Sequence, residues 1–327
     1  MKNFWQKLEK PILALAPMEE VTDTVFRQIV ASCCPPDVFF TEFTNVEGLL
    51  SKGKNVVSQR LQFTSKERPI IAQIWGLNPE SYYKAARYIK DLGFDGIDIN
   101  MGCPEKKVVK TGSCSALMNN RDLAVKIIKA TREGAGGLPM SVKTRIGFAK
   151  IETDNWISFL LQQELDGLII HGRTVKEASD VPAQWDEIGK AVILRNKISP
   201  ATIIIGNGDV LTYNQARQYW QKYKVDGVMI GRGVFKNPWV FDKNKTSVTP
   251  LELIDLFIKH ITLFENTWGD SKNFSIMKKF YKMYINGFEG AGELRNKLNQ
   301  FNNPADSTTF LRRYATLIGP TPLGVGV

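Results

Sequence analysis

Cysteine and histidine are scarce in this chain of 327 residues, which contains four cysteines and two histidines. Cys33 and Cys34 are adjacent, and Cys103 and Cys114 lie far from them and from each other, so no pair has the spacing of zinc ligands. Four cysteines in this length cannot build a dense disulfide framework either. The composition therefore predicts free thiols and no metal site.

Long apolar runs are also missing. No stretch of about 18 apolar residues could span a bilayer, and the charged N-terminal segment MKNFWQKLEKP lacks the apolar core of a secretory signal. We therefore expect a cytoplasmic protein, and nothing in the sequence implies a membrane or a stable protein partner.

Acidic residues are the minority among the charged ones. There are 43 Lys and Arg against 33 Asp and Glu, a formal net charge of +10. A basic excess of this size suits a polyanionic partner, and nucleic acid is the commonest one.

Eight short apolar runs rich in Ile and Val alternate with amphipathic stretches between residues 11 and about 240. Runs of this kind are typical of strands buried on both faces. They are PILALAP (11–17), DVFFTEF (37–43), PIIAQIW (69–75), GIDIN (96–100), LPMSVKTR (138–145), GLIIH (167–171), ATIIIGN (201–207) and GVMIG (227–231). Eight strands with intervening helices predict an α/β protein with a (β/α)8 TIM barrel. A doubly wound sheet is the alternative, but it favours a Gly-rich fingerprint after the first strand, where this chain has APMEEVTD.

Helix boundaries are indicated at several places. The stretch 79–93 has its apolar residues on one face and Gly93 at its end, and Thr212 is expected to cap a helix over 213–223. After residue 241 the chain becomes polar, and Pro250 is expected to start the first of several helices without strand alternation. We expect a catalytic barrel over 1–245, a small helical domain over 246–317 and a loose tail over 318–327.

Polar side chains cluster at the ends of the predicted strands. In a TIM barrel, the residues that follow the C-terminal ends of the strands form the active site. Amide, ammonium, guanidinium and imidazole groups placed there cost free energy unless a ligand or a partner satisfies them. In chain order these rim residues are Pro17, Met18, Glu42, Gln73, Asn100, Cys103, Lys143, Arg145, His171, Arg173, Asn207, Gly208, Asp209, Gly231 and Arg232.

The turns GNGD (206–209) and GRG (231–233) follow the last two strands, where TIM barrels commonly hold a phosphate. Glycine lets backbone N–H groups approach phosphate oxygens, and Arg232 can add charge-assisted hydrogen bonds. Lys143 and Gln73 would suit the polar edge of a flavin, since a cation there stabilises the charge of the reduced ring. Residue type leaves alternatives open: Lys143 could be the Schiff-base lysine of a sugar-phosphate aldolase, and Gln73 could be a core amide satisfied by its neighbours.

Cys103 lies between Gly102 and Pro104 in a loop rich in glycine and lysine, the setting of a reactive thiol. By residue type it could act as a nucleophile or as an acid. No histidine lies near it in sequence to form a Cys–His pair, although His171 could approach it in space.

These motifs together resemble those of the bacterial-type tRNA-dihydrouridine synthases. The matching segments are ALAPMEEVTDTVFR (14–27), TEF (41–43), DINMGCPEKKVVKTGSCSALM (98–118), SVKTRIG (141–147), HGRT (171–174), NGD (207–209) and IGRG (230–233), followed by a similar helical tail. The resemblance implies reduction of tRNA uridines to 5,6-dihydrouridine, with NADPH reducing FMN, FMN delivering hydride to uracil C6, and Cys103 protonating C5. It also implies that FMN is held by Pro17, Met18, Gln73, Lys143, His171, Asn207, Gly208, Asp209, Gly231 and Arg232.

The resemblance further implies how tRNA is bound. Asn100 and Arg145 would hold the uracil edge and Arg173 a nearby phosphate, after the base has left its stack. The helical domain would contact tRNA through Lys278, Lys279, Lys282 and Arg295. The alternative for this segment is a packed aromatic face with solvated lysines.

One position departs from the family pattern. Cys114 stands where a glycine is common, and Ser115 where alanine is usual. If the backbone there needs a positive φ, Cys114 is strained.

Two other functions would use parts of the same sequence. A dihydroorotate dehydrogenase-like enzyme acting on a free pyrimidine would share the phosphate turns but would not need a basic helical tail. A tRNA-binding protein without catalytic activity would not need Cys103 and Lys143.

Overall fold

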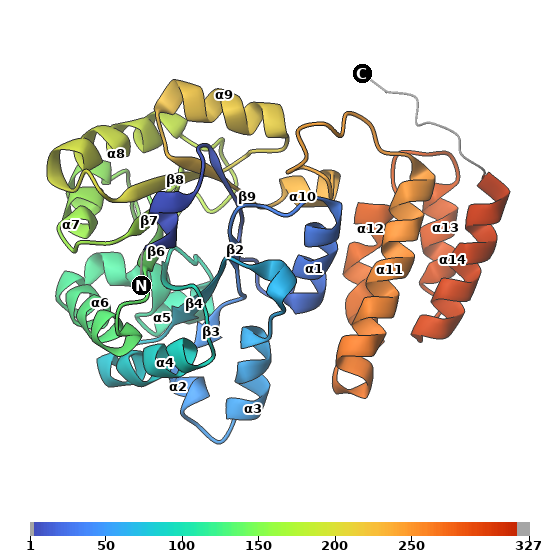
Figure 1. Cartoon of the computed structure of the whole chain (residues 1–327), viewed down its shortest axis with the longest axis horizontal. Coiled ribbons are helices and arrows are strands. Elements are labelled where there is room, and N and C mark those ends of the chain that lie inside the picture. Colours follow the sequence, from blue (N-terminus) through green and yellow to red (C-terminus); the bar gives the residue numbers. More distant parts are fainter. Residues whose placement is uncertain (1–2, 319–327) are drawn as a thin grey trace.

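A computed structural model describes residues 3–318, and eight parallel strands within it form a nearly closed barrel (Figure 1). The strands are β1 (Ile12–Leu15), β2 (Phe39–Phe40), β4 (Ile70–Trp75), β5 (Gly96–Met101), β6 (Met140–Arg145), β7 (Gly167–His171), β8 (Ile203–Asn207) and β9 (Gly227–Ile230). Each of the eight predicted runs coincides with one of them, and β5 extends one residue beyond its run. The prediction of a TIM barrel is therefore confirmed.

The strands follow the order β1-β9-β8-β7-β6-β5-β4-β2 around the sheet. A parallel bridge between Ala14 and Val38 joins β1 to the segment before β2 and nearly closes the ring. The short strand β3 (Thr44–Asn45), which the sequence did not predict, pairs with the C-terminal end of β4.

Helices surround the barrel on the outside. The α-helices are α1 (Thr24–Cys33), α2 (Val46–Leu49), α3 (Lys54–Val57), α4 (Pro79–Asp91), α5 (Lys106–Lys110), α6 (Arg121–Ala135), α7 (Ser158–Leu161), α8 (Trp185–Ile198), α9 (Tyr213–Tyr223) and α10 (Gly233–Lys236). Shorter helical segments are η1 (Phe4–Lys7), η2 (Ser58–Leu61), η3 (Ser65–Glu67), η4 (Cys114–Asn119) and η5 (Thr153–Ile157). Thr212 caps α9 as predicted, because its Oγ1 accepts from the Gln215 N–H at 3.1 Å.

The rest of the described chain is helical. Its segments are α11 (Pro250–Trp268), η6 (Gly269–Ser271), η7 (Phe274–Phe280), α12 (Tyr281–Tyr284), α13 (Ala291–Leu298) and α14 (Pro304–Ile318). Pro250 starts α11 as predicted, behind the N-cap Thr249. The presence of a C-terminal helical region is thus confirmed, while the division at residues 245 and 246 stays a prediction. The expected loose tail lies almost entirely outside the described residues.

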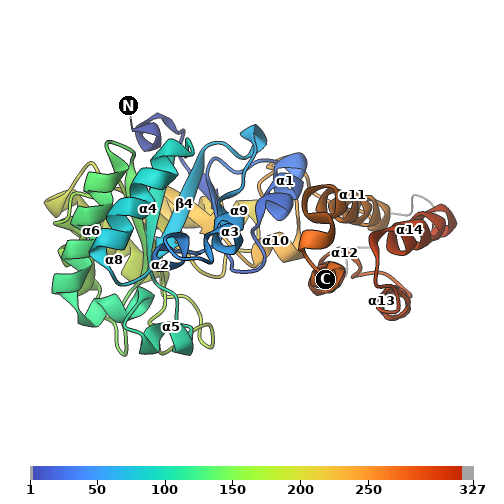
Figure 2. The same cartoon turned by 90° about the horizontal axis from the view of Figure 1, so that it is seen from below.

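The helical region packs beside α1 at one end of the molecule (Figure 2). The Phe26 and Phe280 rings stack with centroids 5.4 Å apart. One Asp23 oxygen caps α1, and the other accepts from Trp268 Nε1 at 2.9 Å and Lys272 Nζ at 3.0 Å. No described helix is both long and apolar enough to cross a membrane.

Alternation along the strands separates the core from the site. Alternate residues of a strand share a face, so Ile169 and His171 of β7 point the same way, as do Ile205 and Asn207 of β8. The apolar member of each pair is fully buried in the barrel, and the polar member lies nearer the C-terminal end. On β7 and β8, one face of the strand therefore packs an apolar residue into the barrel core and, two residues further on, places a polar residue in the site.

Candidate active site

The C-terminal ends of the strands surround a cavity of about 290 Å³. Nine of the ten residues predicted to hold FMN line it: Pro17, Met18, Lys143, His171, Asn207, Gly208, Asp209, Gly231 and Arg232. Gln73 does not, because its fully buried amide is engaged by Asp98 and Asn100.

Positive charge dominates this cavity. Lys143, Arg145, Arg173 and Arg232 line it, against the single carboxylate of Asp209. That carboxylate accepts from Arg173 at 2.5 Å and from Arg232 at 2.9 Å. Since the cations outnumber the carboxylate, the donor set fits an anionic group such as the phosphate of FMN.

Gly208 is required by its surroundings. Its φ is +130°, and a Cβ there would lie 2.6 Å from the Ala183 side chain and 3.2 Å from the His171 ring. A side chain at this position would therefore displace the wall of the cavity.

Lys143 reaches into the barrel mouth from β6. Its Nζ donates to Asn207 Oδ1 at 3.2 Å. Burial, followed by the charge of Arg145, lowers the Lys143 pKa to about 8, although Asp98 and Cys103 act in the opposite direction. The ammonium is thus costly to bury unless an anionic ligand stabilises it.

His171 is held as a neutral imidazole. Burial, together with the charges of Lys143, Arg145, Arg173 and Arg232, keeps its pKa well below the usual value. Arg173 Nη1 lies 3.0 Å from His171 Nε2. A neutral ring can accept a hydrogen bond from this guanidinium, whereas a protonated one could not.

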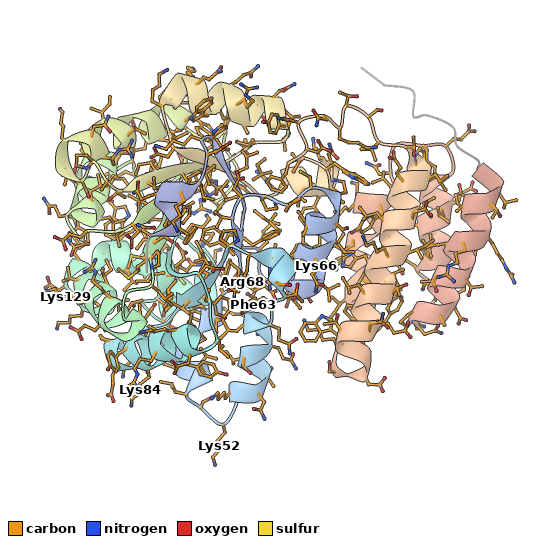
Figure 3. All side chains as sticks on the ribbon, viewed as in Figure 1. Lys52, Phe63, Lys66, Arg68, Lys84 and Lys129 are labelled. Atoms are coloured by element: carbon orange, nitrogen blue, oxygen red, sulfur yellow. The ribbon has the colours of Figure 1, made fainter. Side chains whose placement is uncertain are left out.

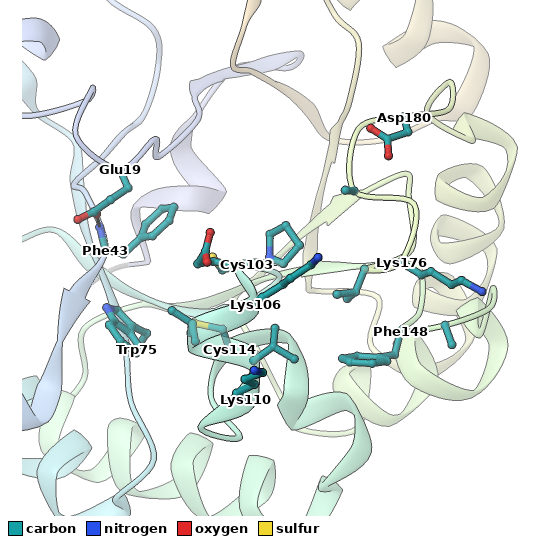
Figure 4. A pocket seen from close by; sticks show the side chains of 17 residues that line it. Glu19, Phe43, Trp75, Cys103, Lys106, Lys110, Cys114, Phe148, Lys176 and Asp180 are labelled. Carbon is teal, nitrogen blue, oxygen red and sulfur yellow. Dashed lines mark hydrogen bonds between the residues drawn. The ribbon is translucent and has the colours of Figure 1, made fainter.

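A second cavity, of about 1170 Å³, adjoins the first, and Pro104 lines both. Cys103 lies on its wall near the middle, with Phe43 and Trp75 to one side and Phe148 to the other (Figure 4). Its charged lining residues are Lys106, Lys110, Lys176, Glu19, Glu105 and Asp180. Flat apolar rings around a thiol suit a planar, partly polar ring as ligand.

The Cys103 thiol is half-buried and stays protonated at neutral pH. Burial raises its pKa above the ordinary value and outweighs the lowering by the Glu105 N–H and by the charges of Arg145 and Lys143. A protonated thiol donates a proton more readily than it attacks as a nucleophile.

Asn100 holds the loop that carries Cys103. Its Oδ1 accepts the backbone N–H groups of Gly102 at 3.1 Å and Cys103 at 3.0 Å, and its Nδ2 donates to Gln73 Oε1 at 2.9 Å. The amide predicted to bind uracil is therefore largely engaged in positioning this loop.

Arg145 joins the same loop to the segment after β7. Its Nε donates to the Gly102 carbonyl at 2.9 Å, and its Nη1 donates to the carbonyls of Thr174 at 3.0 Å and Ala178 at 2.8 Å. Among the described residues Nη2 makes no hydrogen bond, so it is the part of Arg145 available to a ligand.

Arg173 lies in the first cavity, where its side chain is 3% exposed and ion-paired with Asp209. The four basic residues predicted to contact tRNA lie in the helical region, and three of them have internal partners. Lys278 donates to the Asn299 carbonyl at 2.9 Å, Lys279 to the Glu20 carbonyl, and Arg295 to the Ile285 carbonyl at 2.6 Å. Lys282 is exposed and has no hydrogen bond or ion pair within residues 3–318.

Cys114 adopts the positive φ that its alignment with a glycine suggested. Its φ is +52°, and its side chain is 2% exposed. The expected backbone strain is therefore present, at about 1–2 kcal/mol for a residue with a Cβ.

Sequence reasoning missed several residues of the site. Phe43 and Trp75 are the last residues of two predicted strands, so their place at the strand ends was a usable signal. Asp98 lies two residues before Asn100 and therefore shares its inward face. Phe148 lies in the loop after β6, and nothing in its local sequence indicated that it faces the second cavity.

Comparison with known proteins identifies the family. Residues 14–318 match the family described as Dihydrouridine synthase (Dus). A probable tRNA-dihydrouridine synthase of Staphylococcus aureus (strain COL) is 42% identical over 316 residues, which cover 96% of each chain. The probable tRNA-dihydrouridine synthase 2 of Bacillus subtilis (strain 168) is 43% identical over 299 residues, covering 90% of this chain and 91% of the relative.

Among solved structures, a 2-naphthoyl-CoA reductase in complex with 2-naphthoyl-CoA superposes with a TM-score of 0.55 at 10% identity, covering 72% of this chain and 51% of that chain. This likeness supports the barrel fold alone. The sequence matches, which span nearly the whole chain, carry the assignment. The protein belongs to the dihydrouridine synthase family.

Proposed function

We propose that the protein reduces specific uridines in tRNA to 5,6-dihydrouridine, using FMN as cofactor and NADPH as reductant, in the cytoplasm where tRNA is available. The observation that carries this proposal is the junction of the two cavities at Pro104. There the protonated thiol of the neighbouring Cys103 lines the cavity walled by aromatic rings, and this cavity adjoins the cation-lined one. The names of the two curated relatives support the same reaction.

The first cavity would hold FMN. Arg173 and Arg232, with the turn at Gly208 and Gly231, would bind its phosphate, and Lys143 would lie beside its polar ring edge. Gln73 would take part through its remaining N–H, since its other polar atoms already have partners. Bound there, FMN supplies the hydride that reduces uracil C6.

Cys103 would act as the general acid. The C5–C6 double bond of uracil is conjugated with the C4 carbonyl, so a hydride added at C6 leaves negative charge that C5 must discharge by taking a proton. A thiol with a raised pKa keeps that proton until the transfer occurs. Lys143 and Arg145 stabilise the thiolate that is left, because both lie close enough to lower the thiol pKa.

The second cavity would receive the uridine after it leaves the tRNA stack. Phe43 and Trp75 offer apolar faces near Cys103, and the free Nη2 of Arg145, which lines the adjoining first cavity, offers a donor for a uracil carbonyl. The helical region would hold the tRNA body, with Lys282 as one exposed basic residue that is free to meet a phosphate.

The test is the dihydrouridine content, measured by mass spectrometry, of tRNA incubated with the purified protein, FMN and NADPH. We expect dihydrouridine at defined positions. A protein that binds FMN and oxidises NADPH but leaves every tRNA unmodified would instead point to a free pyrimidine as the substrate.

A further inference from the structure

The floor of the barrel mouth contains a carboxylate that the proposed chemistry does not use. Asp98, on β5, is fully buried. Its Oδ1 accepts from Ser141 Oγ at 2.6 Å, and its Oδ2 accepts from Gln73 Nε2 at 2.7 Å. A buried carboxylate is costly, so a side chain retained at this position calls for a reason.

A chain of hydrogen bonds leads from the Cys103 loop through Asn100 and Gln73 to Asp98. In every one of them the donor lies on the side of the loop and the acceptor on the side of Asp98. The starting point is fixed by the backbone, because the N–H groups of Gly102 and Cys103 can only donate, and Asn100 Oδ1 accepts both. The amide of Asn100 must then turn its Nδ2 to Gln73, which accepts with Oε1 at 2.9 Å.

Gln73 in turn has only N–H groups left to offer, so the next residue must accept. An ionised carboxylate is the side chain of this size that presents acceptors alone. Burial raises the Asp98 pKa to about 7, whereas the hydrogen bonds from Ser141 and Gln73 and the charge of Lys143 favour the ionised form. A reversed amide at either Gln73 or Asn100 would direct an N–H group against another donor, which leaves buried polar atoms unpaired.

We propose that Asp98 is a positioning residue for the proton donor: by fixing the amide orientations of Gln73 and Asn100, it holds the Cys103 loop in the geometry for protonating uracil. The consequence for uridine reduction rests on the proposed function. The effect of Asp98 on the position of the Cys103 loop is independent of that function.

The first variant is Asp98→Asn, which keeps the size and removes the acceptor-only character. Asp166→Asn is a matched control, since Asp166 precedes β7 at the opposite end of the barrel and also accepts a side-chain amide, from Asn3 Nδ2 at 2.6 Å. We expect Asp98→Asn holoenzyme to reduce tRNA uridine at least tenfold more slowly in single turnover after reduction by NADPH. We expect Asp166→Asn to stay within twofold of wild type.

A second readout needs no turnover. A loosened loop exposes Cys103, so its alkylation by iodoacetamide, followed by peptide mass spectrometry, should become at least threefold faster in Asp98→Asn and stay unchanged in Asp166→Asn. If wild type forms no dihydrouridine, the proposed function fails, yet the alkylation rates still decide whether Asp98 positions the loop.

A rescue separates positioning from simple destabilisation. Gln73→Glu alone places two carboxylates against each other and should also loosen the loop. In the double variant Asp98→Asn/Gln73→Glu, the new amide at position 98 would accept from Ser141 and donate to the new carboxylate at position 73. That carboxylate would accept from Asn100, so every donor again faces an acceptor, with the hydrogen bond between positions 73 and 98 reversed in direction.

Cys103 alkylation in the double variant should return to within twofold of wild type, even if a single variant fails to fold. Wild-type alkylation in both single variants, or a double variant as reactive as the singles, would overturn the proposal.

Discussion

Cys103 combines two properties that a proton donor needs, a raised pKa and a place on the wall of the substrate-sized cavity. Removing the thiol should leave FMN binding intact, because the cation-lined cavity does not include the Cys103 side chain. Cys103→Ala should therefore lower dihydrouridine formation by about 10²–10⁴-fold, the usual contribution of a general acid.

The measurement is dihydrouridine by mass spectrometry beside the flavin absorbance of the purified variant. Cys34→Ala is the control, since Cys34 lies at the end of α1, away from both cavities. Equal loss in the two variants would mean that Cys103 is not the acid.

Burial of the Lys143 ammonium lowers the stability of the FMN-free protein. Its pKa is lowered to about 8 by burial, so the unfolded chain binds more protons than the folded one between pH 8 and the ordinary lysine value. Stability of the FMN-free protein should therefore rise with pH through that window.

At pH 7 the buried ammonium is a penalty, and Lys143→Met should stabilise the FMN-free protein by about 1–3 kcal/mol. The same change should weaken FMN binding, measured by quenching of flavin fluorescence. A variant that loses stability when FMN-free would contradict this account of Lys143.

Among the elements, the loop between β5 and α6 carries the clearest local strain. Cys114 has a φ of +52° in this loop, at the start of η4. Cys114→Gly removes the strain of about 1–2 kcal/mol but also removes a buried side chain, so the two effects nearly cancel.

Cys114→Val keeps the strain and adds a β-branched side chain that tolerates positive φ poorly. We expect the free energy of unfolding of Cys114→Gly to lie within about 1 kcal/mol of the wild-type value. That of Cys114→Val should be lower by about 2 kcal/mol or more. Urea unfolding of the holoenzyme measures both. The reverse order of stability would show that packing, and not φ, controls this position.

On the scale of the whole molecule, the basic residues behind the net charge of +10 have two different roles. Several lysines and arginines of the helical region hold that region together or join it to the barrel, as Lys278, Lys279 and Arg295 do. Lys282 remains free to contact phosphate.

Lys282→Glu should raise the KM for tRNA severalfold with little change in kcat, and the salt dependence of tRNA binding should become shallower. Lys129→Glu is the control, because Lys129 on α6 lies at the end of the barrel away from the helical region (Figure 3). NADPH oxidation without tRNA should be unchanged in both. An equal effect of the two substitutions would indicate a nonspecific response to charge.

The barrel could be predicted from the order of residues alone. Strands buried on both faces must be nearly continuous apolar runs, and eight such runs are legible without neighbours. The sequence also indicated the residues at the C-terminal ends of the strands. Burying a polar residue there costs free energy unless a ligand or a partner satisfies it. Cys103, Lys143 and His171 were found in this way. A positive φ at Cys114 was raised only as a condition, by the glycine that is common at this place in the family that the motifs resemble.

Which polar atoms are free to bind a ligand depends on how the strands and loops come together in the fold. Arg145 and Asn100 looked like ligand-binding groups, yet Arg145 holds two loops that are distant in sequence. Asn100 joins the loop that follows it to the distant Gln73. Gln73 does not line the cation-lined cavity, because its amide is engaged by Asp98 and Asn100. Hydrogen bonds between separate strands and loops depend on barrel closure and register, and no local pattern of residues encodes those partners.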